Sequence, residues 1–209
     1  MTTFAATAGI QANGDVPFAQ RAGLAGIVGG LVSAAAAVAT AVWPTDVPAT
    51  LLRHPFSVEA FRATLLLATA ANVLMLIAVL GLVRSGIVGR GRLGIVGNRL
   101  AVMGMALIVP AQLGFVFIAN SLDDSTESNS LGAAIGLATT LAAVGLILQG
   151  IAVLRDGAWT GWGRWTPLLA GAFVPLVLIP VQAVWPEGFL WPIAGWSACF
   201  VALGAALRR

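Results

Sequence analysis

Lysine and tyrosine are absent from this 209-residue sequence, and cysteine and histidine each occur once, as Cys199 and His54. The lack of lysine excludes a retinal or pyridoxal Schiff base. A single cysteine excludes a disulfide within these residues and a CxxC redox or zinc motif. A single histidine excludes a bis-histidine haem site. We therefore expect no cofactor and no metal site in this chain.

Charge is also scarce, because only 9% of the residues are charged while 59% are hydrophobic. Soluble domains are about 25% charged and roughly 45–50% apolar, so the composition predicts that lipid surrounds most of the protein surface. Stacked aromatic residues between basic ones, as nucleic-acid binders use, are missing, and we expect no nucleic-acid partner. The G-x-S-x-G elbow, the Walker A loop and the dinucleotide fingerprint are missing too.

Six apolar stretches follow the first 20 residues, each near the length of about 20 residues that a helix needs to cross a bilayer. They are 23–43, 63–83, 100–119, 131–154, 167–185 and 189–207. There is no sustained alternation of the kind that indicates a β-barrel, and a helix satisfies its own backbone groups in lipid. The sequence therefore predicts an all-α polytopic membrane protein, with six transmembrane helices in one domain at 21–209 and a mobile tail at 1–20.

The arginines predict how this bundle is oriented. Only Arg53 and Arg62 flank one side of the six predicted spans. The other nine flank the opposite side: Arg21, Arg84, Arg90, Arg92, Arg99, Arg155, Arg164, Arg208 and Arg209. Arginine-rich loops stay in the cytoplasm, so we expect the tail and both termini there. The abundant alanine, glycine, arginine and proline suggest a GC-rich bacterial genome, and hence the cell membrane of a bacterium.

Short phrases recur at related intervals along the chain. Pro-x-Gln at 110–112 recurs at 180–182, LAT at 67–69 recurs at 137–139, and AVWP at 41–44 recurs at 183–186. These intervals are 70 residues or about twice that, and a fixed period indicates repeated units. We therefore expect three repeated two-helix hairpins in the same orientation, an arrangement that is common in transporters but not restricted to them.

Two glycine pairs, Gly26–Gly30 and Gly132–Gly136, have the small-xxx-small spacing that lets helices approach closely. The simplest interpretation is packing within the fold, and the alternative is contact with a second copy. As partners we expect membrane lipids, with the protein itself or another membrane protein as further candidates.

The stretch LLRHPFSVEAFR, residues 51–62, places the histidine and two arginines between two apolar spans. Ser57 is a good helix N-cap and Glu59 suits the first turn, so the plainest interpretation is a cap and an interfacial anchor. The alternative is that His54, Glu59 and Arg62 point over the mouth of the bundle and bind a ligand. In an enzyme, His54 would be the general acid or base, Glu59 would orient it and Arg62 would hold an anionic group.

Polar side chains within the spans form the second group of candidates: Asn72, Gln112, Gln149, Gln182, Thr139 and Thr140. Such side chains usually form hydrogen bonds between neighbouring helices. The alternative is a polar pocket or path, in which Gln112 and Gln182 would occupy equivalent places in the repeat.

From these features we favour a non-enzymatic membrane protein that binds a small lipophilic ligand, a lipid or a membrane partner. The ligand-binding candidates are His54, Glu59, Arg62, Asn72, Gln112 and Gln182. One alternative is a membrane-embedded enzyme that acts on a lipophilic substrate through His54, Glu59 and Arg62. The other is a small transporter built from repeated hairpins.

Overall fold

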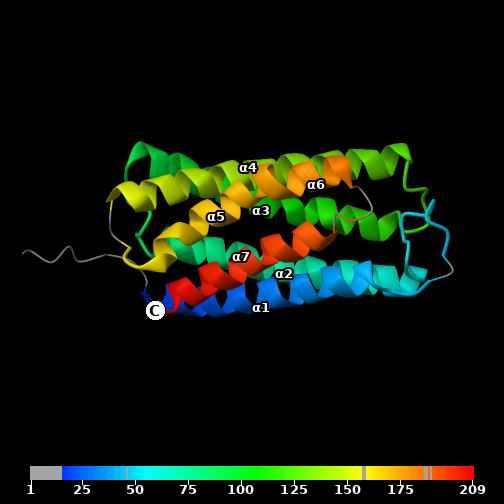
Figure 1. Cartoon of the computed structure of the whole chain (residues 1–209), viewed down its shortest axis with the longest axis horizontal. Coiled ribbons are helices and arrows are strands. Elements are labelled where there is room, and N and C mark those ends of the chain that lie inside the picture. Colours follow the sequence, from blue (N-terminus) through cyan, green and yellow to red (C-terminus); the bar gives the residue numbers. More distant parts are fainter. Residues whose placement is uncertain (1–15, 46, 157–158, 186–187, 189) are drawn as a thin grey trace, which may run out of the picture.

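A computed structural model describes residues 16–45, 47–156, 159–185, 188 and 190–209. Within these ranges the chain is helical, and its only β-type pairing is a single bridge between Leu51 and Leu122. Six helical segments are long and apolar enough to cross a membrane. The predicted all-α bundle of six transmembrane helices is therefore confirmed (Figure 1).

The first four spans are single helices: α1 (Val16–Ala41), α2 (Val58–Arg84), α3 (Arg92–Phe117) and α4 (Thr126–Asp156). The fifth span is composite: η1 (Trp162–Trp165), α5 (Thr166–Phe173), η2 (Val174–Leu178) and α6 (Ile179–Val184). The sixth span is α7 (Leu190–Leu207).

The first span begins earlier than the sequence predicted, because residues 16–20 of the expected tail already belong to α1. Pro17 is tolerated in the first helical turn, where backbone N–H groups have no partner within the helix. Gln20 and Arg21 make this segment more polar than the rest of the span, which is why the sequence placed it in the tail. At a helix end that reaches the membrane interface, however, polar side chains carry only a small free-energy penalty. Residues 1–15 of the predicted tail lie outside the described residues.

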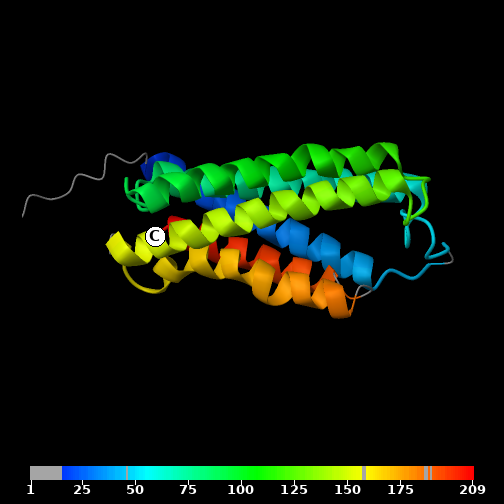
Figure 2. The ribbon, with the colours of Figure 1, turned by 90° about the horizontal axis from the view of Figure 1, so that it is seen from above.

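Two prolines explain why the fifth span is not one regular α-helix. Pro175 lies in the π-helical turn η2, and Pro180 lies at the start of α6. Proline has no backbone N–H and its ring crowds the preceding turn, which disturbs α-helical hydrogen bonding. Beyond this turn α6 separates from α4 (Figure 2), and Val184 at its end is 86% exposed.

The helices pack in a ring that follows the chain, and α7 closes it against α1 (Figure 1). The most extensive contacts join α3 to α4, and α1 to both α7 and α2. The fifth span contacts α4 more extensively than it contacts α7. The threefold repetition of hairpins stays a prediction.

The two glycine pairs have different surroundings. A Cβ atom on Gly30 would lie 2.6 Å from the carbonyl oxygen of Ser197 on α7, and Gly26 is similarly crowded between α2 and α7. Near Gly132 and Gly136, apart from the backbone of α4 itself, no atom of the residues that the structure describes lies within 4 Å of such a Cβ position. The expectation of packing within the fold therefore holds for the first pair and is wrong for the second.

The core of the bundle is filled by large apolar side chains. Most of the largest fully buried ones come from α2, α3, α4 and α7, and they include Met75, Met105, Leu146 and Phe200. Trp196 packs edge-on against Phe200, with ring centroids 5.2 Å apart, and its indole N–H donates to the Ala170 carbonyl over 3.0 Å. An indole buried among apolar groups needs such a partner.

Candidate functional site

The two ends of the bundle carry different charged groups. The arginine-rich end contains the start of α1, the junction of α2 and α3, the end of α4 and the end of α7 (Figure 1). The opposite end contains the segment between α1 and α2, which carries Arg53 and His54, and the segment between α3 and α4. We refer to these two segments, residues 42–57 and 118–125, as the paired loops.

The paired loops are joined by backbone hydrogen bonds. The Leu52 N–H donates to the Ser121 carbonyl over 3.1 Å, and the Asp123 N–H donates to the Thr50 carbonyl over 2.9 Å. This pattern fixes the position of both loops at the end of the bundle, because each loop satisfies backbone groups of the other.

Arg53 and His54 form separate contacts within these loops. Arg53 Nη1 donates to Asn120 Oδ1 over 3.2 Å, while Arg53 Nε is buried and has no hydrogen-bond partner among the described residues. His54 Nδ1 lies 2.7 Å from the carbonyl oxygen of Val47. His54 as a whole is exposed to the surroundings of the loop.

The start of α2 follows the expected capping pattern. The Ser57 side chain accepts a hydrogen bond from the Ala60 N–H over 3.3 Å, and Glu59 lies in the first turn. Arg62 points to α3, where its Nε donates to the Val116 carbonyl over 3.2 Å. Glu59 is exposed and forms no ion pair with His54 or Arg62. The three residues therefore lie at the same end of the bundle but do not converge on one another.

The amide side chains within the spans form hydrogen bonds between helices. Asn72 Nδ2 on α2 donates to Gln112 Oε1 on α3. Gln149 Nε2 on α4 donates to Asn98 Oδ1 on α3 over 2.9 Å. Gln182 is exposed on α6, so the structure brings Asn72 and Gln112 together but does not bring Gln182 to them.

Asn98 was not among the residues singled out from the sequence. It precedes the apolar stretch that was expected to begin at residue 100, whereas α3 already begins at Arg92. The signal that could have identified it is its polarity two residues before the expected apolar stretch, where an amide is well placed to bond a neighbouring helix.

An apolar groove of about 270 Å³ lies between the second half of α1 and the first half of α2. Its lining residues are small or aromatic in the main: Ala36, Ala39, Thr40, Trp43, Phe56, Ala60, Ala63, Thr64 and Leu67. The rings of Trp43 and Phe56 pack at the end of the groove beside the paired loops, with centroids 5.3 Å apart. We refer to this end of the groove as its outer end.

Sequence reasoning missed this groove because alanine and threonine carry no distinctive chemistry. A signal was nevertheless present: A-x-x-A-T occurs at 36–40 and again at 60–64, followed three residues later by Trp43 and Leu67. On α2 the four positions are spaced i, i+3, i+4 and i+7 and share one face, whereas on α1 the first three share one face and Trp43 follows the end of the helix. The two faces meet across the groove, where their small side chains leave space.

No group of three or more His, Cys, Asp or Glu side chains within the described ranges is arranged to hold a metal ion. No protein-family model, curated protein sequence or solved structure significantly matches this chain. The function is therefore inferred from the geometry of the chain itself.

Proposed function

We propose that this polytopic membrane protein is not an enzyme and that it binds a lipophilic ligand in the groove between α1 and α2. The observation that carries this proposal is the groove itself, whose lining is almost entirely apolar and whose outer end lies beside the hydrogen-bonded paired loops. Ligand sites are typically concave, largely apolar and formed in advance of binding.

The size of the groove limits the class of ligand. Pockets for drug-sized molecules measure about 300–1,000 Å³, and this groove is slightly smaller, at about 270 Å³. It therefore suits one acyl chain or one small lipophilic molecule better than a whole phospholipid. The Thr40 hydroxyl is already used, because it donates to the Ala36 carbonyl of its own helix over 2.8 Å.

A polar group on this ligand would lie at the outer end of the groove. His54 precedes the lining residue Phe56 by two positions, and Glu59 directly precedes the lining residue Ala60. Both side chains are exposed, so we keep them as candidates for contact with the polar part of the ligand. Arg62 remains a weaker candidate, because its Nε bonds to α3.

The geometry gives less support to the two alternative functions. An enzyme using His54 as acid or base and Glu59 as its orienting group requires contact between the two, whereas His54 Nδ1 contacts the Val47 carbonyl. A transport path lined by Gln112 and Gln182 requires both to face one passage. Gln112 bonds to Asn72, and Gln182 is exposed on α6.

We also propose that the arginine-rich end lies in the cytoplasm of a bacterial cell and that the groove opens in the outer leaflet of its plasma membrane. The support is the distribution of arginines along the chain, with nine on one side of the spans and two on the other. Positively charged segments are retained on the cytoplasmic side during insertion.

The groove can be tested by filling it. Ala39 and Ala63 line it and are exposed, so the double variant Ala39→Leu/Ala63→Leu should fold while occupying its volume. The matched control is Ala106→Leu/Ala133→Leu, which adds two leucine side chains to the exposed surfaces of α3 and α4. The readouts are mass spectrometry of co-purifying lipophilic molecules and titration of the purified protein with a fluorescent fatty acid.

We expect the double variant to bind the fatty acid at least about tenfold more weakly and to lose the co-purifying molecule, with the control unchanged. A tenfold change corresponds to about 1.4 kcal/mol, which is less than burial of two or three methylene groups contributes. Equal binding by all three proteins would show that the probe only partitions into the micelle, and would refute the proposal.

A further inference from the structure

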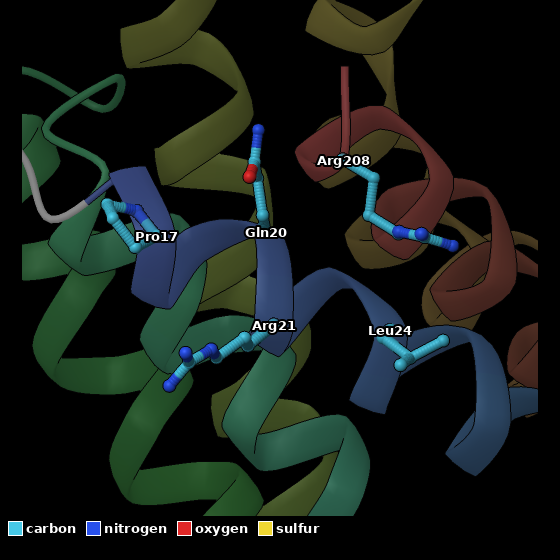
Figure 3. Close-up of a pocket in the computed structure, with 5 residues that line it drawn as sticks. All are labelled: Pro17, Gln20, Arg21, Leu24 and Arg208. Atoms are coloured by element: carbon cyan, nitrogen blue, oxygen red, sulfur yellow. The ribbon is translucent and has the colours of Figure 1, made fainter.

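A second cavity lies at the arginine-rich end, where the start of α1 meets the end of α7 (Figure 3). It has a volume of about 400 Å³ and is lined by Pro17, Gln20, Arg21, Leu24 and Arg208. It is at the opposite end from the groove between α1 and α2, and its lining differs, because it combines two guanidinium groups and an amide with apolar side chains.

The spacing of four lining residues explains why they surround one cavity. Pro17, Gln20, Arg21 and Leu24 are spaced i, i+3, i+4 and i+7, so they share one face of α1. The polar members belong to the first two turns, and Leu24 lies about one turn deeper along the helix. The face therefore changes from polar to apolar as α1 enters the bundle.

Arg208 reaches this face because two glycines let α7 approach α1. A Cβ atom on Gly23 would lie 2.8 Å from Cγ of Arg208 and 2.6 Å from the Gly204 carbonyl oxygen. Any larger residue at position 23 would therefore push the end of α7 away. The absence of a side chain there lets the aliphatic part of Arg208 lie directly against α1.

The two arginines of the cavity differ from three others at the same end. Those three each lie over an aromatic ring, with distances from Cζ to the ring centroid of 4.6, 5.5 and 5.2 Å: Arg84 over Phe18, Arg164 over Trp165 and Arg209 over Trp162. The guanidinium groups of Arg21 and Arg208 form no hydrogen bond or ion pair with any described residue. Figure 3 shows them on different sides of Gln20, with the guanidinium end of Arg21 directed away from that of Arg208.

An apolar strip continues from the cavity along α1. Leu24, Val28 and Leu31 are all exposed large hydrophobic residues, and they recur every three or four positions on one side of the helix. Seven residues of helix rise span about 10 Å. An anionic group bound in the cavity that Arg21 and Arg208 line would thus be continuous with a surface suited to a hydrocarbon chain.

We propose that this cavity binds the phosphate-bearing headgroup of an anionic phospholipid, with an acyl chain along Leu24, Val28 and Leu31. Guanidinium groups bind phosphate oxygens through charge-assisted, often paired hydrogen bonds. The Gln20 amide adds a donor that a zwitterionic or anionic headgroup can use. This site does not depend on the ligand of the groove between α1 and α2.

The test compares two double variants that remove the same charge. Arg21→Gln/Arg208→Gln alters the cavity, whereas Arg90→Gln/Arg99→Gln removes two exposed arginines elsewhere at the same end of the bundle. Each full-length protein is placed in nanodiscs that contain phosphatidylcholine with a minor fraction of phosphatidylglycerol. Native mass spectrometry then measures how many molecules of each lipid remain bound. Arg21→Lys/Arg208→Lys keeps the charge and should retain part of the binding.

We expect enrichment of phosphatidylglycerol by the wild-type protein, a loss of about tenfold in the cavity variant, and a change below about threefold in the control. Equal losses in the two glutamine variants would show only general attraction between cations and an anionic bilayer, and would overturn the site. No preference for phosphatidylglycerol in the wild type would also overturn it. Displacement of the lipid by millimolar inorganic phosphate would reassign the cavity to free phosphate.

Discussion

Gln149 on α4 and Asn98 on α3 form a hydrogen bond of 2.9 Å across an interface that is otherwise made largely of glycine, alanine and leucine. The Gln149 side chain is fully buried, and its Oε1 has no partner among the described residues. This amide therefore relies on Asn98 for its one side-chain hydrogen bond, whereas Asn98 is only half-buried.

This asymmetry predicts unequal effects of removing either partner. Asn98→Ala leaves a buried amide without any partner and should lower the free energy of unfolding by about 1–2 kcal/mol. Gln149→Met removes the buried amide while keeping an unbranched side chain of similar length, and should cost less than about 1 kcal/mol. Unfolding in mixed micelles with increasing dodecyl sulfate measures both. A larger loss for Gln149→Met than for Asn98→Ala would contradict the prediction.

The glycines of α3 and α4 predict a second contrast. A Cβ atom on Gly104 would lie 2.6 Å from the Ala138 carbonyl oxygen, whereas Cβ atoms on Gly132 and Gly136 would meet no atom of another described segment within 4 Å. Gly104→Ala should therefore destabilise the protein by about 1–3 kcal/mol through overpacking. Gly132→Ala and Gly136→Ala should be neutral or stabilising by up to about 1 kcal/mol, because alanine favours the helix.

The same unfolding titration, combined with measurement of oligomeric mass by light scattering, checks this contrast. A loss of stability in Gly136→Ala that is accompanied by a smaller oligomer would show that another copy packs against this face of α4. Equal tolerance at Gly104 and Gly136 would contradict the close α3–α4 contact.

The number and approximate positions of the spans could be predicted because apolar length is a property of each helix alone. Apart from the Gly26–Gly30 face of α1, the faces by which the helices pack could not be predicted. Leu146 is fully buried and Leu137 is 64% exposed, although both are leucines of α4. Lipid tails are as apolar as a protein core, so the sequence contains no polarity contrast between the two surroundings. The closure of the ring by α7 against α1 was hidden for the same reason.

Candidate residues could be predicted only where they are polar, because a polar side chain within an apolar span stands out from its neighbours. Amides within spans were expected to bond between helices, and Asn72 with Gln112 does so. The sequence did not determine which amide would find a partner, because Gln182 occupies an equivalent position in the proposed repeat and remains exposed. The groove was hidden because its lining is small and apolar, like most of the chain.

Orientation provides the last prediction, since the proposed ligand must reach the paired loops from one side of the membrane. In a Cys199→Ala background, Asp124→Cys places a thiol in the paired loops and Gly91→Cys places one between α2 and α3. Both positions are exposed, and Gly91 has an extended backbone, with φ −65° and ψ 159°, that any residue can adopt.

A membrane-impermeant maleimide should label Asp124→Cys in intact cells but label Gly91→Cys only after permeabilisation. The physical reason is that segments rich in arginine are retained in the cytoplasm, and Gly91 lies between Arg90 and Arg92. Labelling of both variants in detergent provides the control for accessibility. If Gly91→Cys reacted in intact cells and Asp124→Cys did not, the groove would open toward the cytoplasm, and its ligand would have to come from the inner leaflet.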